Sequence, residues 1–246
     1  MIDNDRTIQK RIDMDMLSRS MTGIFVYAVL LPAVFWPFNF HQLQPQLSFI
    51  FAASMLAVSL LRLVHKVLTP RLYDYSANLW RGLFMFLSLC HASILSTFFV
   101  FAIYDERFNP VLHVSMLAIG GISSGAVVAL IPRVKLALTN LIFLLMPSIV
   151  AGLILSDKLP FAGMLAVYFA FIAMIGTRSS KEYIRSFEIE LALEEQNKEI
   201  EQQSKIDALT HIYNRGYFNI ELERQWECAR RLNLKLSLLL IDVDYF

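Results

Sequence analysis

The stretch Gly82–Tyr104, GLFMFLSLCHASILSTFFVFAIY, decides the fold class because it contains no Asp, Glu, Lys or Arg. A helix needs about 20 mostly apolar residues to cross roughly 30 Å of hydrocarbon, so this stretch predicts a transmembrane helix. The whole chain agrees, since 56% of its 246 residues are hydrophobic and 17% are charged, with a mean hydropathy of +0.51. A soluble hydrophobic bundle would instead show polar residues every few positions. The sequence therefore predicts a mainly α, polytopic membrane protein.

Apolar runs on both sides of this stretch predict further spans. We expect about six, with five or seven as alternatives, because prolines interrupt the first run and the last run is short. The expected spans are Met21–Phe38, Leu47–Leu63, Gly82–Tyr104, Pro110–Ile131, Leu136–Leu155 and Pro160–Thr177. The first run lacks a small-residue cleavage site, which indicates an anchor and not a signal peptide. Residues 1–20 are thus predicted to be a cytoplasmic segment, and residues 21–177 a six-span membrane sensor domain.

Lysine and arginine residues concentrate in alternate connections between the predicted spans. They lie before the first span, between the second and third, between the fourth and fifth, and after the sixth. The other connections carry only Arg107 and Lys158, each close to an acidic residue. The positive-inside rule then places both termini in the cytoplasm, with the spans among membrane lipids. The outer connections are too short to fold a ligand-binding domain, so any stimulus is expected to be read in or at the membrane.

Global charge and cysteine content exclude several other classes. The net charge is +1, which gives no reason to expect a nucleic-acid partner. Cys90 and Cys228 are too few and too far apart for a disulfide framework or a CxxC metal site.

His91 lies inside the third predicted span, and intramembrane ionisable groups are candidates for function, here for sensing. A metal site shared with His113 is not expected, because at 1.5 Å per residue the two side chains differ in depth by roughly 15 Å. The segment Gly120–Gly125 lies at matching depth in the fourth span and contains two serines. We expect it to pack the third and fourth spans closely and to offer hydroxyl partners to His91. A ligand crevice there is the second interpretation.

Residues 178–206 are charged and contain no glycine or proline, so they predict a cytoplasmic connector helix. One heptad register places Ile189, Leu193, Gln196, Ile200 and Gln203 on a seam. Polar residues occupy alternate core positions of this seam, which is therefore weak. We expect a parallel two-helix connector that forms a homodimer, with a solvated single helix as the alternative.

The C-terminal segment carries the most specific pattern, Asp207-Ala-Leu-Thr-His-Ile-Tyr-Asn-Arg-Gly-Tyr-Phe218. An amphipathic helix is predicted after it, with Asn214 as its N-cap and with Phe218, Leu222, Trp226, Ala229 and Leu232 on its apolar face. The apolar run 236–241 then predicts a buried strand, which ends at Asp242 and Asp244. This order resembles D-x-L-T-x-L-x-N-R-x-x-F followed by L-L-x-I-D-x-D-x-F, the beginning of GGDEF domains.

The resemblance implies a membrane-anchored diguanylate cyclase, which makes cyclic di-GMP and pyrophosphate from two GTP molecules. It implies an α/β domain of which residues 207–246 are the first helix and strand. Asp242 and the backbone carbonyl of Val243 resemble the ligands of Mg²⁺ or Mn²⁺, and the backbone of Tyr245 and Phe246 resembles the phosphate-side nucleotide contact. Asp244 is more doubtful as a ligand. His211 and Gly216 stand where the family often has Gly and Arg.

The segment is expected to be an incomplete GGDEF domain. The motif Gly-Gly-Asp-Glu-Phe does not occur in residues 1–246. No catalytic residue is therefore expected within these residues, and the chain as given is expected to be inactive. The alternative is a non-enzymatic membrane receptor fragment with a degenerate output domain. A histidine kinase would need an acidic residue after His211, where Ile212 stands instead. The charged connector argues against a transporter.

Overall fold

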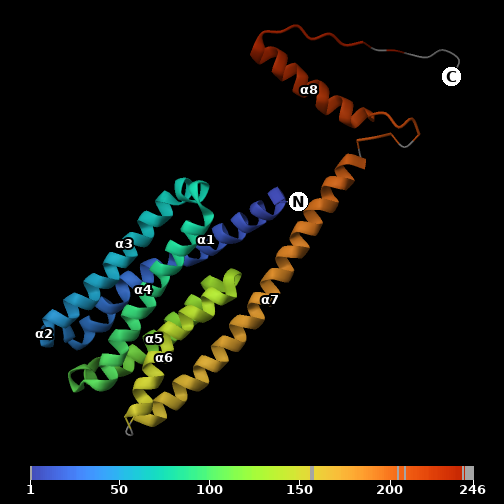
Figure 1. Cartoon of the computed structure of the whole chain (residues 1–246). Coiled ribbons are helices and arrows are strands. Elements are labelled where there is room, and N and C mark those ends of the chain that lie inside the picture. Colours follow the sequence, from blue (N-terminus) through green and yellow to red (C-terminus); the bar gives the residue numbers. More distant parts are fainter. Residues whose placement is uncertain (1, 156–157, 204, 208, 240, 242–246) are drawn as a thin grey trace. The chain divides into compact units, whose positions relative to one another are not determined.

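The computed structural model describes residues 2–155, 158–203, 205–207, 209–239 and 241 of the chain. Helices dominate these residues (Figure 1). The long helices are α1 Ile2–Phe35, α3 Pro45–Tyr75, α4 Ala77–Tyr104, α5 Asn109–Leu130, α6 Val134–Ile154 and α7 Leu159–Gln203, and α8 is Arg215–Leu232. The short helical elements are η1 Trp36–Phe38, α2 Phe40–Leu43, η2 Glu106–Phe108 and η3 Ile131–Arg133.

Five stretches of the described residues are long and apolar enough to cross a membrane. They are Arg6–Phe38, Pro45–Tyr75, Ala77–Tyr104, Glu106–Ile154 and Leu159–Ile200. The fourth stretch contains both α5 and α6, of 22 and 21 residues, with η3 between them. Each of these two helices is roughly 30 Å long, which matches the hydrocarbon thickness on its own. Each of the six predicted apolar runs therefore lies mostly in a long helix, while six crossings of a bilayer remain a prediction.

Several helices extend well beyond the predicted spans. Helix α1 begins at Ile2 and not near Met21, and α3 continues to Tyr75 and not to Leu63. The predicted connector is helical through Gln203, but it forms one helix of 45 residues with the predicted last span. The hydrocarbon thickness sets the length of an apolar run, but it does not set the length of the helix that contains this run. The flanking segments are rich in helix-forming residues and lack glycine, so the helices continue.

Consecutive long helices alternate in direction, which brings the basic segments together at one end of the bundle (Figure 1). Lys10 of α1 forms an ion pair with Asp74 near the end of α3, at 3.3 Å. The hydroxyl of Ser180 in α7 donates a hydrogen bond to the carbonyl of Ile131 in η3, at 2.9 Å. The segments that the positive-inside rule assigned to one side of a membrane therefore share one end of the bundle.

The connections between helices are stabilised by local caps. At the basic end, Ser76 separates α3 from α4, and its hydroxyl accepts a hydrogen bond from the backbone N–H of Leu79 at 3.3 Å. At the opposite end, Asp105 accepts hydrogen bonds from the side chain and the backbone of Arg107. These bonds hold the pKa of Asp105 below its ordinary value. The acid and the base of this outer connection thus neutralise each other.

Aromatic and aliphatic side chains fill the interior of the bundle, and others cover its outside. Phe98 and Phe99 of α4 pack with Leu144 of α6 in one core cluster. Large apolar side chains such as Val67 and Leu117 are instead about three-quarters exposed, at 77% and 78%. An outer surface this apolar is typical of a helical bundle that lies in lipid.

Close helix contacts involve other glycines than the sequence predicts. A Cβ added at Gly120, Gly121 or Gly125 would meet no atom within 4 Å, so these glycines do not bring α4 and α5 into close contact. The close approaches are made by Gly152, facing Ala162 of α7, and by Gly176, facing Val127 of α5. The expectation that the glycines of the segment Gly120–Gly125 pack closely on α4 is therefore wrong, and Gly121 and Gly125 instead line a cavity of the bundle.

Gly176→Ala is expected to destabilise the bundle by about 1–3 kcal/mol, the usual cost of overpacking a core. Its Cβ would lie 2.7 Å from Cγ1 of Val127, a buried β-branched side chain that cannot rotate freely away. Gly163→Ala in the same helix is the matched control, because its Cβ would meet nothing within 4 Å. Unfolding of both variants in detergent would measure the difference, and equal stability would contradict the packing of α7 on α5.

The chain divides into residues 1–185 and residues 186–246. In the second unit, an isolated antiparallel bridge joins Ile206 to Tyr213, and α8 follows. The predicted strand over 236–241 is not formed at the described positions 234–239 and 241, which have irregular backbone. A strand needs a neighbouring strand to pair its N–H and C=O groups, and none lies beside these residues in the described part of the chain.

Candidate functional site

The segment from Asp207 to Asn214 forms a tight, hydrogen-bonded turn. The Asp207 carboxylate accepts hydrogen bonds from the backbone N–H of Leu209 at 3.2 Å and from the backbone and hydroxyl of Thr210 at 2.9 and 2.8 Å. These bonds lower the pKa of Asp207, those from Thr210 first. His211 adopts a φ of 55°, in the left-handed region. Glycine is the residue that adopts this conformation without strain.

Helix α8 begins where the sequence predicts it. The Asn214 side chain accepts a hydrogen bond from the Tyr217 backbone N–H at 2.9 Å, so the predicted N-cap is confirmed. The predicted apolar face remains open to its surroundings, with Phe218, Trp226 and Leu232 all exposed. Leu236 and Leu238 approach this face near Trp226 and line a shallow cavity of about 380 Å³.

The residues predicted to bind the metal and nucleotide lie outside the described residues. These are Asp242, Val243, Tyr245 and Phe246. Their chemistry fits the expected group, because Mg²⁺ and Mn²⁺ prefer carboxylate and carbonyl oxygens, which Asp242 and Val243 supply. The described residues contain no cluster of three or more His, Cys, Asp or Glu suited to a metal ion.

His91 is fully buried in α4 and lies within a polar cluster. Its Nε2 lies 3.2 Å from the Ser59 hydroxyl and 3.3 Å from the Met55 carbonyl, and its ring stacks on Tyr27 with centroids 4.4 Å apart. Its Nδ1 lies 3.3 Å from Nη1 of Arg62. A guanidinium group can only donate, so Nδ1 accepts and Nε2 carries the proton. His91 is therefore a neutral residue that holds Arg62 in position.

The serines of α5 are not partners of His91, contrary to the sequence-based expectation. The hydroxyls of Ser123 and Ser124 lie 3.0 and 2.6 Å from the hydroxyl of Tyr168 in α7. That hydroxyl also contacts the Gly120 carbonyl. The polar positions of α5 thus face α7, and α3 supplies the partners of His91 instead.

Arg62 is the least expected residue of this cluster. Its side chain is buried inside α3, and in the described part of the chain no carboxylate pairs with it. Its guanidinium lies 5.7 Å from the ring centroid of Phe84, which adds a cation–π contact. The position of Arg62 inside the predicted span Leu47–Leu63 already marks it as a candidate functional residue. The sequence-based interpretation used its charge only for the positive-inside rule.

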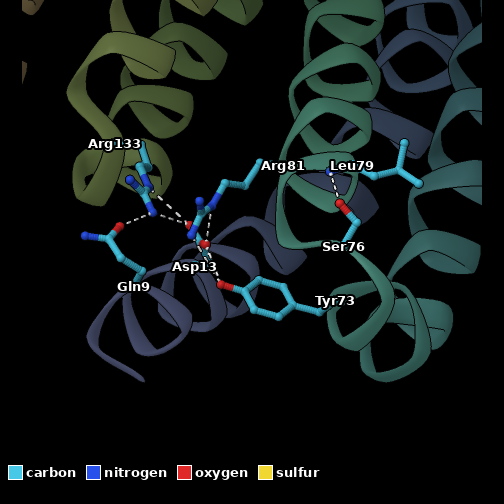
Figure 2. Close-up of polar contacts among 7 residues, drawn as sticks. All are labelled: Gln9, Asp13, Tyr73, Ser76, Leu79, Arg81 and Arg133. Atoms are coloured by element: carbon cyan, nitrogen blue, oxygen red, sulfur yellow. Dashed lines mark hydrogen bonds and ion pairs between the residues drawn. The ribbon is translucent and has the colours of Figure 1, made fainter. Parts of the chain in front are cut away.

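A second polar cluster lies at the basic end of the bundle, around fully buried Asp13 (Figure 2). One carboxylate oxygen lies 2.6 Å from Nε of Arg81 and accepts the Tyr73 hydroxyl hydrogen bond at 2.9 Å. The other lies 2.7 Å from Nη2 of Arg133, which also donates to Gln9 at 2.7 Å. We call these five residues the Asp13 junction. It joins α1, α3, α4 and η3, and only their three-dimensional contacts reveal it.

Helix α7 is attached to the same end of the bundle. The Tyr183 hydroxyl donates a hydrogen bond to the Asp15 carboxylate at 2.8 Å, and the Arg19 guanidinium lies 5.2 Å from the Tyr183 ring centroid. Asp15 and Arg19 follow Asp13 in α1 by about half a turn and by fewer than two turns. A displacement of α1 relative to its neighbours would therefore act directly on α7, the helix that continues to residue 203.

Comparison with known proteins agrees with the motif at the C-terminus. Residues 204–246 match the family described as "Diguanylate cyclase, GGDEF domain". No curated protein and no solved structure matches the chain. The matched segment begins just before the Asp207 turn and includes α8 and the predicted metal-binding residues. Residues 204–246 are therefore similar to GGDEF domains of diguanylate cyclases.

Proposed function

We propose that the protein is a membrane-bound diguanylate cyclase whose helical bundle is a sensor that controls the output domain. The observation that carries this proposal is the order of parts. A bundle of apolar helices leads through one continuous helix, α7, to a segment that matches the GGDEF family. The cyclase joins two GTP molecules into cyclic di-GMP, and each 3′-hydroxyl attacks an α-phosphate while pyrophosphate leaves.

The C-terminal residues supply groups suited to this reaction. A divalent cation, Mg²⁺ or Mn²⁺, neutralises phosphate charge when it is bound. Asp242 and the Val243 carbonyl would hold that cation, and the backbone of Tyr245 and Phe246 would approach the phosphates. The Asp207 turn and the Asn214 cap fix the start of α8, the helix that precedes these residues in the chain.

The proposed location is the bacterial inner membrane, with both termini in the cytoplasm where GTP is available. The distribution of charge supports this orientation. Basic residues of the N-terminal segment, of the α3–α4 connection and of η3 meet at the Asp13 junction and its surroundings. At the opposite end, Arg107 is paired with Asp105. The positive-inside rule assigns the first end to the cytoplasm.

Dimerisation through α7 is part of the proposal, because the reaction requires two GTP molecules. Ile189, Leu193 and Ile200 of the predicted seam are all more than half exposed, at 52%, 53% and 62%. They recur at heptad-like spacing on a helix that lacks glycine and proline after residue 178. These side chains are available to a second copy of α7.

Production of the full-length protein in bacteria, followed by quantification of cellular cyclic di-GMP, tests this function. The expected result is a clear rise above cells that contain the empty vector, with the protein in the membrane fraction. Membrane insertion with no rise in cyclic di-GMP would instead favour a non-enzymatic receptor with a degenerate output domain.

A further inference from the structure

A cavity of about 420 Å³ lies inside the bundle, lined by residues of α1, α3, α4, α5 and α6. Apolar residues such as Leu30 and Ile122 form most of its wall. Two of its lining residues, Val26 of α1 and Leu117 of α5, are also exposed on the surface that we assign to lipid. The volume falls in the range of small-molecule sites, and the open side permits entry from the bilayer.

Several polar residues line this cavity, and three that lie within α3, α4 and α6 are buried. Arg62 is 7% exposed, Ser88 is 4% exposed and Asn140 is 2% exposed. The Ser88 hydroxyl and Oδ1 of Asn140 are buried without a hydrogen-bond partner. Nδ2 of Asn140 donates to the Ser88 carbonyl at 3.2 Å, which holds the two residues together. Buried polar atoms rarely remain unpaired, so the cavity has hydrogen-bonding capacity that the chain itself does not use.

The charge of Arg62 is the decisive feature. A guanidinium has five N–H donors, and Arg62 donates one hydrogen bond to the neutral imidazole of His91. An isolated charge inside a membrane protein is costly, and such charges pair or mark a binding site. A carboxylate is one of the groups that a guanidinium binds best, through two parallel hydrogen bonds. The Ser88 hydroxyl, at the wall of the same cavity, can donate a further bond.

We infer that this cavity binds a single-chain lipophilic carboxylate, such as a medium-chain fatty acid, with its carboxylate on Arg62 and its chain against the apolar wall. The lateral mouth between α1 and α5 admits the ligand from the membrane. His91 is a positioning residue, because it contacts Arg62 and does not line the cavity. Binding itself is independent of the cyclase, whereas control of cyclic di-GMP synthesis by the ligand rests on the proposed function.

Binding of radiolabelled decanoate to the full-length protein in nanodiscs of zwitterionic phospholipid tests this inference. We expect saturable binding, with decanol, which has the same chain length and no charge, binding at least roughly tenfold more weakly. Arg62→Gln is expected to weaken decanoate binding by a similar factor and to leave decanol binding unchanged. Arg71→Gln is the matched control, because Arg71 is exposed on the same helix.

Gly121→Leu provides a test that leaves Arg62 in place. Gly121 lines the cavity, and a Cβ there meets nothing within 4 Å, so the larger side chain can occupy the ligand's space without disturbing the helix packing. We expect it to abolish binding of both probes. Equal binding of decanoate and decanol, unchanged binding by Arg62→Gln, or a bound phospholipid that decanoate fails to displace would each overturn the inference. None of these readouts depends on cyclase activity.

Discussion

Asp13→Asn is expected to destabilise the bundle by about 2–3 kcal/mol. This is the largest loss of stability that we predict for the substitution of a buried polar residue. The substitution keeps the size of the side chain but removes the negative charge that Arg81 and Arg133 share at 2.6 and 2.7 Å. Two guanidinium groups would then face each other across a neutral amide. The estimate lies below that for a fully buried pair, because each arginine side chain is 32% exposed and water screens part of the repulsion.

Asp74→Asn is the matched control for this prediction. Asp74 pairs with Lys10 at 3.3 Å at the same end of the bundle, but the two side chains are 72% and 53% exposed. Exposed ion pairs contribute about 0–1 kcal/mol, so this variant should unfold almost as the wild type does. Unfolding of both variants in mixed micelles gives the comparison. Equal losses would show that the Asp13 junction is not a special contact.

Asp242→Asn is expected to reduce cyclic di-GMP synthesis by the full-length protein by roughly a hundredfold or more, since an amide is a poor ligand for a divalent cation. The variant should still insert in the membrane, because Asp242 is far along the chain from the helices of the bundle. Glu227→Gln makes the same chemical change on an exposed residue of α8, where Glu227 pairs with Arg231 at 2.9 Å. It should retain activity. Wild-type activity of Asp242→Asn would remove Asp242 from the metal site.

The helices of the bundle could be predicted from sequence because hydrocarbon imposes a simple rule. Apolar runs such as Gly82–Tyr104 must be helical in lipid, and their basic flanks indicate a common end. The N-cap of α8 could also be predicted, because its hydrogen bond joins Asn214 and Tyr217, which are three residues apart in the sequence. The true ends of α1 and α3 were missed, since nothing in an apolar pattern shows where a helix continues as a polar one.

Contacts between distant residues were beyond the reach of sequence patterns. Asp13 meets Arg133 across a separation of 120 residues, and its position in a charged N-terminal segment suggests an exposed side chain. The partners of His91 depended on the rotation of α3 and α5 about their axes, which periodicity does not fix in a helix that is apolar all round. The predicted strand over 236–241 depends on pairing with residues distant in sequence, which a local pattern does not provide.

Product analysis with the purified full-length protein tests the central claim most directly. The protein in nanodiscs would be incubated with GTP and Mg²⁺, and the nucleotides and pyrophosphate would be separated and quantified. The account predicts cyclic di-GMP and two pyrophosphates for each molecule of it, with formation lost on chelation of the metal and in Asp242→Asn. GTP that remains unconverted, or that yields a different product, would contradict the assignment of this membrane protein as a diguanylate cyclase.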